Sequence, residues 1–248
     1  MTRAPQQILP YDSPESKSRQ ITRMFNSIAP TYDRLNRTLS LGLDARWRRK
    51  AAESLRTSSP RTILDLAAGT ADLSIEMARR LQPQRIVAAD ISEKMMEIGR
   101  RKVARAGLSA TIAFELCDCL DIACPDNSYD AVTIAFGLRN LENLELAIAE
   151  MQRVLKPGGR LAILELSTPQ AFPLKQLYRL YSTTIIPLAG GWLSGEKQAY
   201  RYLPASIRAV PQGKEMTALI ERQGFSQVQA RSLALGISSL YTGVKNAG

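Results

Sequence analysis

Hydrophobic and polar residues alternate along the chain in two distinct patterns. Short runs rich in β-branched and apolar residues have strand character and occupy residues 61–66, 85–89, 111–116, 129–135 and 160–166. Longer segments between them carry apolar residues at helical spacing among good helix formers, at residues 72–81, 93–106 and 141–155. Because strands that alternate with helices pair in parallel, this order predicts an α/β fold whose parallel sheet has helices on both faces.

The end of the chain follows a different pattern. Residues 225–245, FSQVQARSLALGISSLYTGVK, have the character of two strands joined by a tight turn. Two strands joined in this way can pair only as an antiparallel hairpin, so we expect an antiparallel strand at the edge of the sheet. With 248 residues, of which 45% are hydrophobic, the chain is long enough to bury this sheet in one domain.

The net charge of +10 is divided unevenly along the chain. Lys+Arg minus Asp+Glu is 11 − 5 = +6 for residues 1–60, 10 − 14 = −4 for residues 61–150 and 12 − 4 = +8 for residues 151–248. Basic flanks agree with a nucleic-acid partner, with an anionic membrane surface, or with ordinary solvated charge. The flanks contain no long Lys/Arg block, and LYRLYSTTIIPLAGGWL at 177–193 mixes apolar and aromatic residues, which favours the membrane surface over nucleic acid.

The composition also bears on the compartment and on metals. No apolar run approaches the roughly 20 residues of a membrane span, and residues 1–20 lack the apolar core of a signal peptide, so we expect a cytoplasmic protein. Cys117, Cys119 and Cys124 are clustered, but the chain has no histidine to complete a zinc site. We therefore expect these cysteines to be packing residues and no metal to be bound.

A ligand site is predicted where the first strand meets the following helix, in ILDLAAGTADL at 63–73. The strand brings Asp65 to its carboxyl end, Gly69 allows the backbone to turn, and Thr70 to Asp72 begin the helix. Sheets of this kind bind ligands at that end. Asp72 puts a carboxylate where a pyrophosphate would lie, so the loop favours a cationic ligand such as S-adenosylmethionine. The alternative is that Asp72 is only a helix-cap residue facing solvent.

Two later segments suit the nucleoside half of such a ligand. The run RIVAAD ends in Asp90, which follows Gly69 by 90 − 69 = 21 positions. An acid at this spacing accepts hydrogen bonds from ribose hydroxyls. The third strand leads into CDCLD, where we expect Asp118 and Cys119 beside the adenine, with a polar acceptor for its amino group.

At this point the chain resembles a known family. LDLAAGTADL, AADIS and VLKPGGRLAILE are similar to the motifs of class I S-adenosylmethionine-dependent methyltransferases. Three more stretches, FNSIAPTYDRLNRTLSLGLDARWRR at 25–49, FGLRNLEN at 136–143 and AYRYLPASI at 199–207, resemble the UbiE/MenG family of C-methyltransferases in menaquinone and ubiquinone synthesis. The resemblance extends from about residue 20 to 245.

The resemblance implies a Rossmann-like, seven-stranded and mostly parallel sheet in a single domain, 1–248. Its parts would be a helical segment on the substrate side (1–58), a cofactor-binding core (59–168), a helical insertion on the substrate and membrane side (169–212), and a C-terminal helix and hairpin (213–248). The expected cofactor residues are Asp65, Gly69, Thr70, Asp72, Asp90, Ile91, Asp118, Cys119 and Ala135. The chain departs from the family at Ala68 and Ala71, where glycine is usual, and at Ala135, where serine is frequent. Alanine at 71 keeps the turn if its φ is negative.

The residue inventory limits how carbon methylation could be catalysed. The attacking ring carbon becomes nucleophilic when a neighbouring hydroxyl loses its proton, and without histidine the assistant is a carboxylate, a tyrosine, an arginine or an ordered water. Arg139, with Asn140, follows the fourth strand and is our first choice for stabilising a phenolate charge. Residues expected to close over the ring come from the flanking segments: Tyr32, Asp33, Tyr200, Arg201 and Tyr202. For each of these the alternative is a purely structural role.

The substrate implied by the resemblance is a prenylated quinol. We expect methylation of demethylmenaquinol to menaquinol, with the benzoquinol precursor of ubiquinone as the alternative. A nucleic-acid-binding protein on a degenerate methyltransferase scaffold is the alternative from another class. Because the lipid tail is insoluble, we expect peripheral attachment to the inner face of the cell membrane, no nucleic-acid partner, and a homodimer as one option. Residues 170–195 could form an amphipathic wall for the tail, through Phe172, Leu174, Tyr178, Ile185, Ile186 and Trp192.

Overall fold

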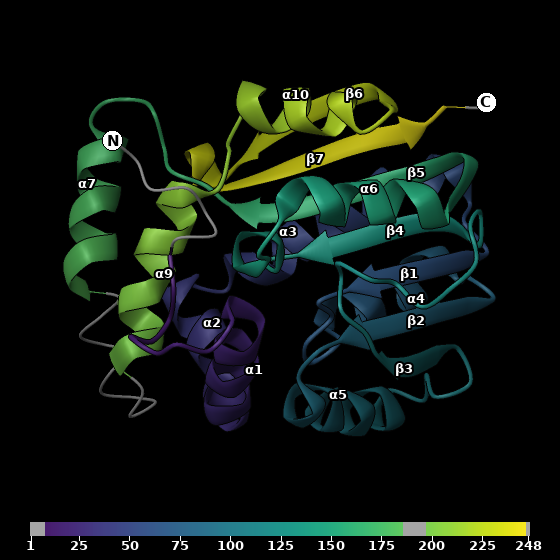
Figure 1. The fold of residues 1–248 in the computed structure, drawn as a ribbon, viewed down its shortest axis with the longest axis horizontal. Coiled ribbons are helices and arrows are strands. Elements are labelled where there is room, and N and C mark those ends of the chain that lie inside the picture. Colours follow the sequence, from purple (N-terminus) through teal and green to yellow (C-terminus); the bar gives the residue numbers. More distant parts are fainter. Residues whose placement is uncertain (1–7, 186–196, 247–248) are drawn as a thin grey trace.

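A computed structural model describes residues 8–185 and 197–246 and contains one seven-stranded sheet (Figure 1). The strand order is β3-β2-β1-β4-β5-β7-β6. The strands are β1 (Thr62–Leu66), β2 (Arg85–Asp90), β3 (Ile112–Leu116), β4 (Tyr129–Ala135), β5 (Leu155–Leu166), β6 (Phe225–Leu233) and β7 (Ser238–Lys245). The first five pair in parallel, which confirms the sheet predicted from the alternating pattern.

The predicted hairpin is also present, but its antiparallel strand is not at the edge. Strand β7 pairs antiparallel with both β5 and β6, so it lies one place in from the edge. Strand β6 therefore forms the edge and runs parallel to the first five strands. The reason is burial: β7 carries Leu240 and Tyr241, which are 3% and 2% exposed, whereas most side chains of β6 are partly or fully exposed.

Strand β5 starts five residues earlier than the apolar pattern predicts. The segment LKPGG at 155–159, which precedes the strand expected at 160–166, is part of that strand, and Leu155 pairs with Tyr129 across an irregularity in the register. Two glycines make this possible. Gly158 has a φ of +75°, and a Cβ on Gly159 would lie 2.7 Å from the carbonyl oxygen of Lys156. Hydrophobic periodicity does not reveal such a bulge, because the bulge depends on a positive φ at Gly158 and on the missing Cβ of Gly159.

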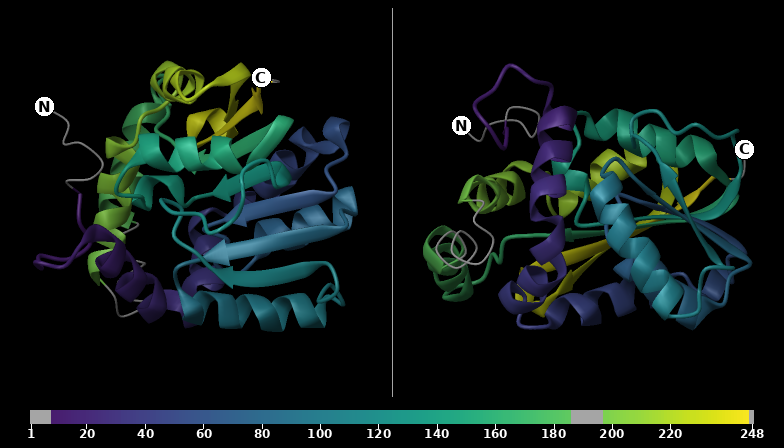
Figure 2. Two further views of the ribbon diagram at one scale, coloured as in Figure 1. Left: turned by 45° about the vertical axis from the view of Figure 1, so that its right-hand side comes forward. Right: turned by 90° about the horizontal axis from the view of Figure 1, so that it is seen from below.

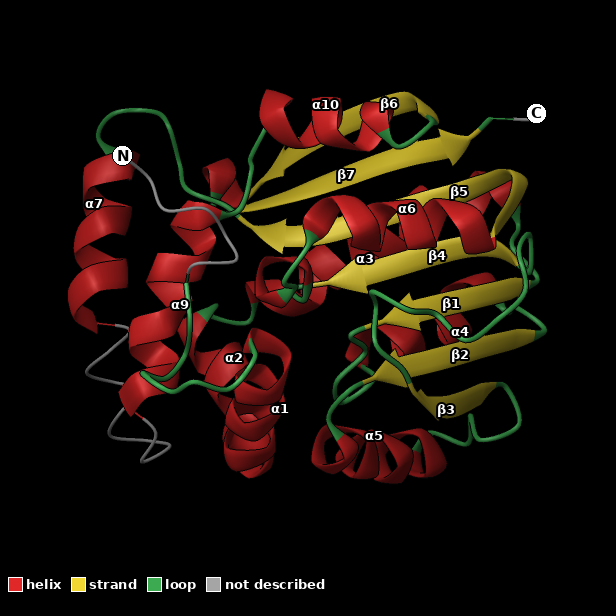
Figure 3. Ribbon diagram, viewed as in Figure 1, coloured by secondary structure: helices red, strands yellow, loops and turns green. Residues whose placement is uncertain are grey.

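Helices cover both faces of the sheet (Figures 1 and 3). One face packs against helices α3 (Leu43–Ser54), α4 (Asp72–Leu81) and α5 (Glu93–Arg105). The opposite face packs against α6 (Leu144–Val154) and α10 (Lys214–Arg222). Successive strand residues point to opposite faces, so Ile63 belongs to the first core and Leu64 to the second.

A third group of helices lies beyond the carboxyl ends of the parallel strands. It comprises α1 (Lys17–Ile28), α2 (Tyr32–Leu39) and α9 (Lys197–Ala209), which share a small core that includes Ile21, Leu35 and Tyr202. Helix α7 (Leu174–Leu180) lies outside α9 and buries none of its residues. Both Figure 1 and the left view of Figure 2 show these helices facing the strand ends. The ligand site predicted there is therefore covered by the N-terminal segment and by the segment after β5.

At the end of the sheet away from the predicted ligand site, one carboxylate joins three strands. Asp130 Oδ2 accepts hydrogen bonds from the backbone N–H of Arg61 at 2.9 Å and of Thr62 at 2.8 Å, and Lys156 Nζ donates to Oδ1 at 2.6 Å. Burial acts to raise the pKa of Asp130, but the donors from Lys156 and Thr62 outweigh it and hold the pKa at about 2. This group joins the starts of β1, β4 and β5.

We expect Asp130→Ala to lower the free energy of unfolding by about 1–2 kcal/mol, because two backbone N–H groups lose their acceptor. The folded-state pKa lies below the unfolded value of about 3.9. The stabilisation is therefore fully present above about pH 4 and is lost as the pH falls toward about 2. Denaturant titrations at several pH values measure this. Asp126→Ala is the matched control, because its carboxylate is 66% exposed and should contribute little. Equal effects of the two variants would contradict the role of Asp130.

Candidate active site

Three cavities adjoin at the carboxyl ends of the strands. The inner cavity is bounded by Asp90, Ile91, Asp118 and Cys119 from the sheet side and by α1. The loop cavity lies at the segment 67–72 between β1 and α4. The apolar cavity is more spacious than either and lies among α2, α3, α7 and α9. Tyr32 and Phe136 line all three, so the cavities meet at these two rings.

The loop after β1 has a left-handed backbone at three positions. Ala67, Gly69 and Ala71 have φ values of +48°, +55° and +63°. The condition under which the sequence analysis let alanine keep the turn, a negative φ at Ala71, is therefore not met. This residue sits at the N-cap of α4 and is completely buried, and holding alanine there costs about 1 kcal/mol. The contacts around the loop must offset this strain.

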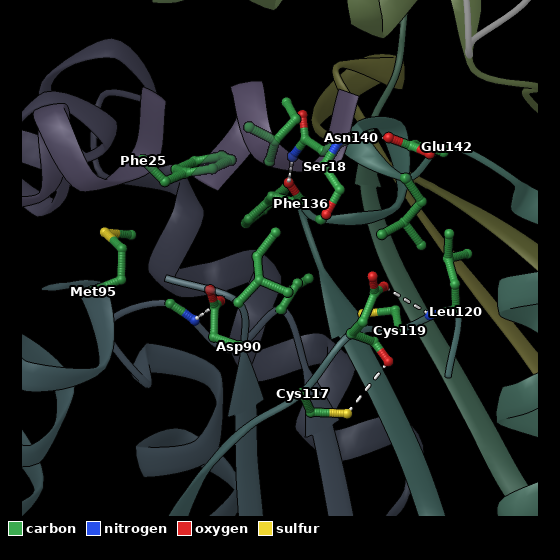
Figure 4. Close-up of a pocket in the computed structure, with 18 of the residues that line it drawn as sticks. Ser18, Phe25, Asp90, Met95, Cys117, Cys119, Leu120, Phe136, Asn140 and Glu142 are labelled. Carbon is green, nitrogen blue, oxygen red and sulfur yellow. Dashed lines mark hydrogen bonds between the residues drawn. The ribbon is translucent and has the colours of Figure 1, made fainter. Parts of the chain in front are cut away.

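Asp90 makes the principal contact with the loop. Its Oδ2 accepts the N–H of Gly69 at 2.7 Å, and its Oδ1 accepts the N–H of Ser92 at 2.8 Å. Burial raises the pKa of Asp90, against the opposing effect of the N–H donors of Ser92, Gly69 and Ile91. Each carboxylate oxygen can accept a second hydrogen bond, and Asp90 lines the inner cavity (Figure 4). A ribose with two adjacent hydroxyls fits this acceptor.

The remaining sheet-side wall of the inner cavity suits a flat, weakly polar ring. Cys117, Cys119 and Leu120 lie together below the cavity in Figure 4, while Phe25 and Ser18 come from α1 on the other side. Burial raises the pKa of Cys117 to about 11, so this thiol is neutral at physiological pH. Asp118 Oδ1 accepts the N–H of Leu120 at 3.0 Å, and Asp118 gives this wall of the cavity a carboxylate.

The loop cavity is lined by two carboxylates. Asp65 is 1% exposed and accepts hydrogen bonds from the hydroxyls of Ser74 and Thr133. Burial raises its pKa to about 6, against the effect of these two donors. Asp72 forms an ion pair with Lys102 and also lines the cavity, as do Thr70 and Ala135. This arrangement fits a ligand group that carries positive charge.

Asp33 does not lie where the sequence analysis expects it. Its Oδ1 accepts the hydroxyl of Thr70 at 2.6 Å, and its Oδ2 pairs with Lys102 Nζ at 2.7 Å. Asp33 lines none of the three cavities. It ties α2 to the loop from behind instead of facing the apolar cavity, because Lys102 of α5 supplies a cation on that side.

Arg139 lines the apolar cavity within a buried ion pair. Its NH1 lies 2.8 Å from Glu165 Oε1 and also donates to the carbonyl oxygen of Phe136, while its backbone N–H donates to Glu165 Oε2 at 3.1 Å. Burial acts to lower the pKa of Arg139, but attraction to Glu165 outweighs it, so the residue is charged. Two buried polar atoms here, Arg139 Nε and Asn140 Oδ1, have no partner in the described part of the chain. Asn140 lines the inner cavity.

The three residues expected from AYRYLPASI are placed differently from one another. Tyr202 is 5% exposed, and its hydroxyl lacks a hydrogen-bond partner among the described residues. Burial raises the pKa of Tyr202, although the charge of Arg139 opposes this. Arg201 is exposed and lines none of the three cavities, because on α9 it occupies the face away from the core. Tyr200 belongs to α9, but its side chain lies outside the part that the structure describes.

The sequence analysis missed Arg48 and Phe136 as lining residues. Arg48 is 7% exposed and lines both the loop cavity and the apolar cavity. The segment LDARWRRK at 43–50 could have predicted the burial of Arg48. Asp44 and Arg48 are four residues apart on the helix, so they can pair, and they share a face with Trp47 and Ala51. Phe136 gives no such signal, because its position depends on a φ of +59° at the end of β4.

Solved structures share this fold at low sequence identity. The [4+2]-cyclase SpnF matches with a TM-score of 0.59 at 19% identity, covering 93% of this chain and 97% of that one. A SAM-dependent methyltransferase from Aquifex aeolicus matches with a TM-score of 0.55 at 17% identity, covering 78% and 88%. These matches confirm the Rossmann-like methyltransferase fold.

Sequence relatives are much more similar. A demethylmenaquinone methyltransferase from Bacteroides fragilis is 50% identical over 97% of this chain and 98% of its own. One from Porphyromonas gingivalis is 45% identical over 98% and 99%. The ubiquinone/menaquinone biosynthesis C-methyltransferase UbiE of Geobacter sulfurreducens is 44% identical over 92% and 90%. Residues 13–245 match the ubiE/COQ5 methyltransferase family, and the chain therefore belongs to that family.

Proposed function

We propose that this protein transfers a methyl group from S-adenosylmethionine to a ring carbon of a prenylated naphthoquinol, converting demethylmenaquinol to menaquinol. One observation carries the proposal: the inner cavity, whose lining includes the carboxylates of Asp90 and Asp118 and suits a nucleoside, meets a large apolar cavity at Tyr32 and Phe136. A methyl donor in the inner cavity and a lipid quinol in the apolar cavity would therefore meet at these two rings. The relatives named demethylmenaquinone methyltransferase favour the naphthoquinol ring.

The residues present fit S-adenosylmethionine, which supplies an electrophilic methyl group on a sulfonium. Asp90 would accept the ribose hydroxyls, and Ile91, Asp118 and Cys119 would border the adenine. The loop cavity with Asp65 and Asp72 would hold the charged amino-acid end. The same carboxylates disfavour a pyrophosphate, so we expect no binding of NAD.

Arg139 is the residue we assign to the substrate charge. A quinol carbon becomes nucleophilic as the neighbouring hydroxyl loses its proton, and the cation at Arg139 would stabilise the resulting oxyanion. Glu165 holds the guanidinium in a water-poor site, where a fixed charge acts more strongly than in solvent. Asn140, next along the chain, would position the ring from the inner cavity.

The apolar cavity opens toward a surface suited to a membrane. Five exposed hydrophobic side chains surround this region and form what we call the apolar rim: Leu41, Phe172, Leu177, Leu180 and Leu235. Three of them also line the cavity, and Lys175 and Arg179 are exposed on the same helix α7. In residues 8–185 and 197–246, no helix has the length and apolarity to cross a bilayer. We propose that segments 1–58 and 169–212 form the substrate side and dock the rim on an anionic membrane, where the isoprenoid tail lies.

The residues expected to form the lipid wall fall into two groups. Ile186 and Trp192 lie outside the described residues, as does the side chain of Ile185. Leu174 and Tyr178, by contrast, line the apolar cavity, and Phe172 is 82% exposed in the apolar rim.

The reaction itself is tested by incubating the purified protein with S-adenosylmethionine and a reduced, prenylated quinol. We expect methylated naphthoquinol by mass spectrometry, formed faster than product from the benzoquinol precursor of ubiquinone. A preference for the benzoquinol would support the alternative substrate. No methylation of either, together with duplex DNA binding that weakens steeply with salt, would support the nucleic-acid alternative.

The role of Arg139 is tested with a neutral pair. Arg139→Ala alone would leave Glu165 buried and unpaired, which costs about 3–5 kcal/mol of stability. The double variant Arg139→Gln/Glu165→Gln removes both charges while keeping similar volumes. We expect its turnover to fall by about 10²-fold or more, with cofactor affinity near that of the unaltered protein.

The single variant Glu165→Gln is the control, because it keeps the cation and its amide oxygen still accepts a hydrogen bond from Arg139, so it should lose much less turnover. It also removes the counter-charge of Arg139, so its free energy of unfolding is measured alongside that of the double variant. Unchanged turnover in the double variant would exclude the proposed role. A loss of cofactor binding together with turnover would make Arg139 a structural residue.

Membrane docking is tested by cosedimentation with vesicles. We expect binding to anionic vesicles at low salt and partial release as salt screens the basic residues. Leu177→Ser/Leu180→Ser should weaken binding and raise the KM for a long-tailed quinol more than for a short-tailed one. Leu116→Ser is the matched control, because Leu116 is 70% exposed on the edge strand β3 and lines none of the three cavities. Equal effects of the two sets of variants would argue against docking through the rim.

A further inference from the structure

Arg48 has contacts that its place in the helix does not explain. It comes from α3 in the N-terminal segment, yet it lines the loop cavity next to Thr70 and Asp72. Its NH1 lies 2.5 Å from Asp44 Oδ2 and 3.7 Å from Asp72 Oδ2, and the guanidinium carbon lies 5.5 Å from the centre of the Phe136 ring. A buried arginine is therefore held at the junction of the loop cavity and the apolar cavity.

Arg48 differs in charge from the other residues that line the inner cavity and the loop cavity. Among the described residues that line the inner cavity and the loop cavity, Arg48 is the one basic side chain. Lys102 pairs with Asp33 and Asp72 and lines neither cavity. Within the described part of the chain, the hydrogen bond and the ion pairs of Arg48 are made by NH1, which leaves the N–H groups on Nε and NH2 as candidate donors to a ligand.

The amino-acid end of S-adenosylmethionine carries both an ammonium and a carboxylate. Asp65 and Asp72 suit the ammonium, but they repel a carboxylate in the same small cavity. A planar guanidinium is the side chain best matched to a carboxylate, because it can donate two parallel hydrogen bonds. The proposed function thus leaves one charged group of the methyl donor with a single candidate partner.

We propose that Arg48 binds the α-carboxylate of the methionyl group of S-adenosylmethionine, and that Asp44 is a positioning residue that holds the guanidinium in place. This inference rests on the proposed function, because it assumes that the loop cavity receives the amino-acid end of that ligand. It makes the N-terminal segment part of the cofactor site. Ligands that lack the carboxylate should then be rejected.

The N-terminus of α4 is the competing anion site, and it is poorly suited. Helix N-termini attract anions through free N–H groups and the helix dipole. Here Asp72 is already in the first turn, so the local charge is negative. The N-cap residue, Ala71, has no side chain that could add a hydrogen bond. A carboxylate would be favoured at Arg48 over this position.

The test compares two ligands by calorimetry: S-adenosylmethionine and its decarboxylated form, which keeps the sulfonium and the ammonium. We expect the unaltered protein to prefer S-adenosylmethionine by at least about tenfold, the size of a hydrogen-bonded charge pair. Arg48→Gln should abolish this preference by weakening only the carboxylate-bearing ligand. Arg48→Lys keeps the charge without the planar fork and should retain part of the preference.

Two controls separate Arg48 from its surroundings. Arg49→Gln changes the neighbouring arginine, which is 54% exposed and pairs with Glu76, and should leave both affinities unchanged. Asp90→Ala removes the ribose acceptor and should weaken both ligands alike, by about tenfold or more.

Two outcomes would overturn the proposal. Equal affinity of the unaltered protein for both ligands would overturn it without any variant, and so would equal losses in Arg48→Gln. If Arg48→Gln does not fold, the ligand ratio of the unaltered protein and of Arg48→Lys still decides. Failure of the proposed function looks different, because then neither ligand binds to the unaltered protein.

Discussion

The hydrogen bonds accepted by the buried carboxylate of Asp90 are the constraint on which the rest of the site depends. One oxygen accepts the N–H of Gly69, just before α4, and the other accepts the N–H of Ser92, the N-cap of α5. A single side chain at the end of β2 therefore fixes where two helices start relative to the sheet. This also offsets the strain of the left-handed backbone at Ala67 and Ala71. The cavity beside Asp90 exists because the loop is held in this conformation.

Charged contacts then join the covering helices to that loop. Asp33 of α2 pairs with Lys102 of α5 and accepts the hydroxyl of Thr70. The buried ion pair of Arg139 and Glu165 ties the segment after β4 to β5. Between these two groups, Tyr32 and Phe136 lie where the inner cavity and the loop cavity meet the apolar cavity. In the proposed function, this arrangement would bring a charged methyl donor and a lipid quinol to one place while keeping their environments different.

The acidic middle and the basic flanks of the chain form different parts of the fold. The acidic middle contains the loop and the strands that form the polar cavities, whereas the basic flanks supply the helices that cover the strand ends. Exposed leucines and basic side chains occur together on α7. Exposed apolar side chains that gather in one region of a surface are a common feature of interaction sites.

Local pattern was enough to predict most elements of the sheet and to place the residues expected to bind the cofactor at the strand ends. The apolar periodicity predicted α4 at residues 72–81 with the observed bounds, and β4 likewise, because burial of one face imposes its period on neighbouring residues. All nine expected cofactor residues line the inner cavity or the loop cavity, since strand ends in a parallel sheet must meet. Only the tertiary structure decided the position of β7, the φ of Ala71, the turning of Asp33 away from the apolar cavity, and the entry of Arg48 into the loop cavity. These depend on partners far away in the chain, such as Lys102 for Asp33, and on which face of a helix packs inward. No periodicity in the sequence records such pairings, because they arise when separate elements meet.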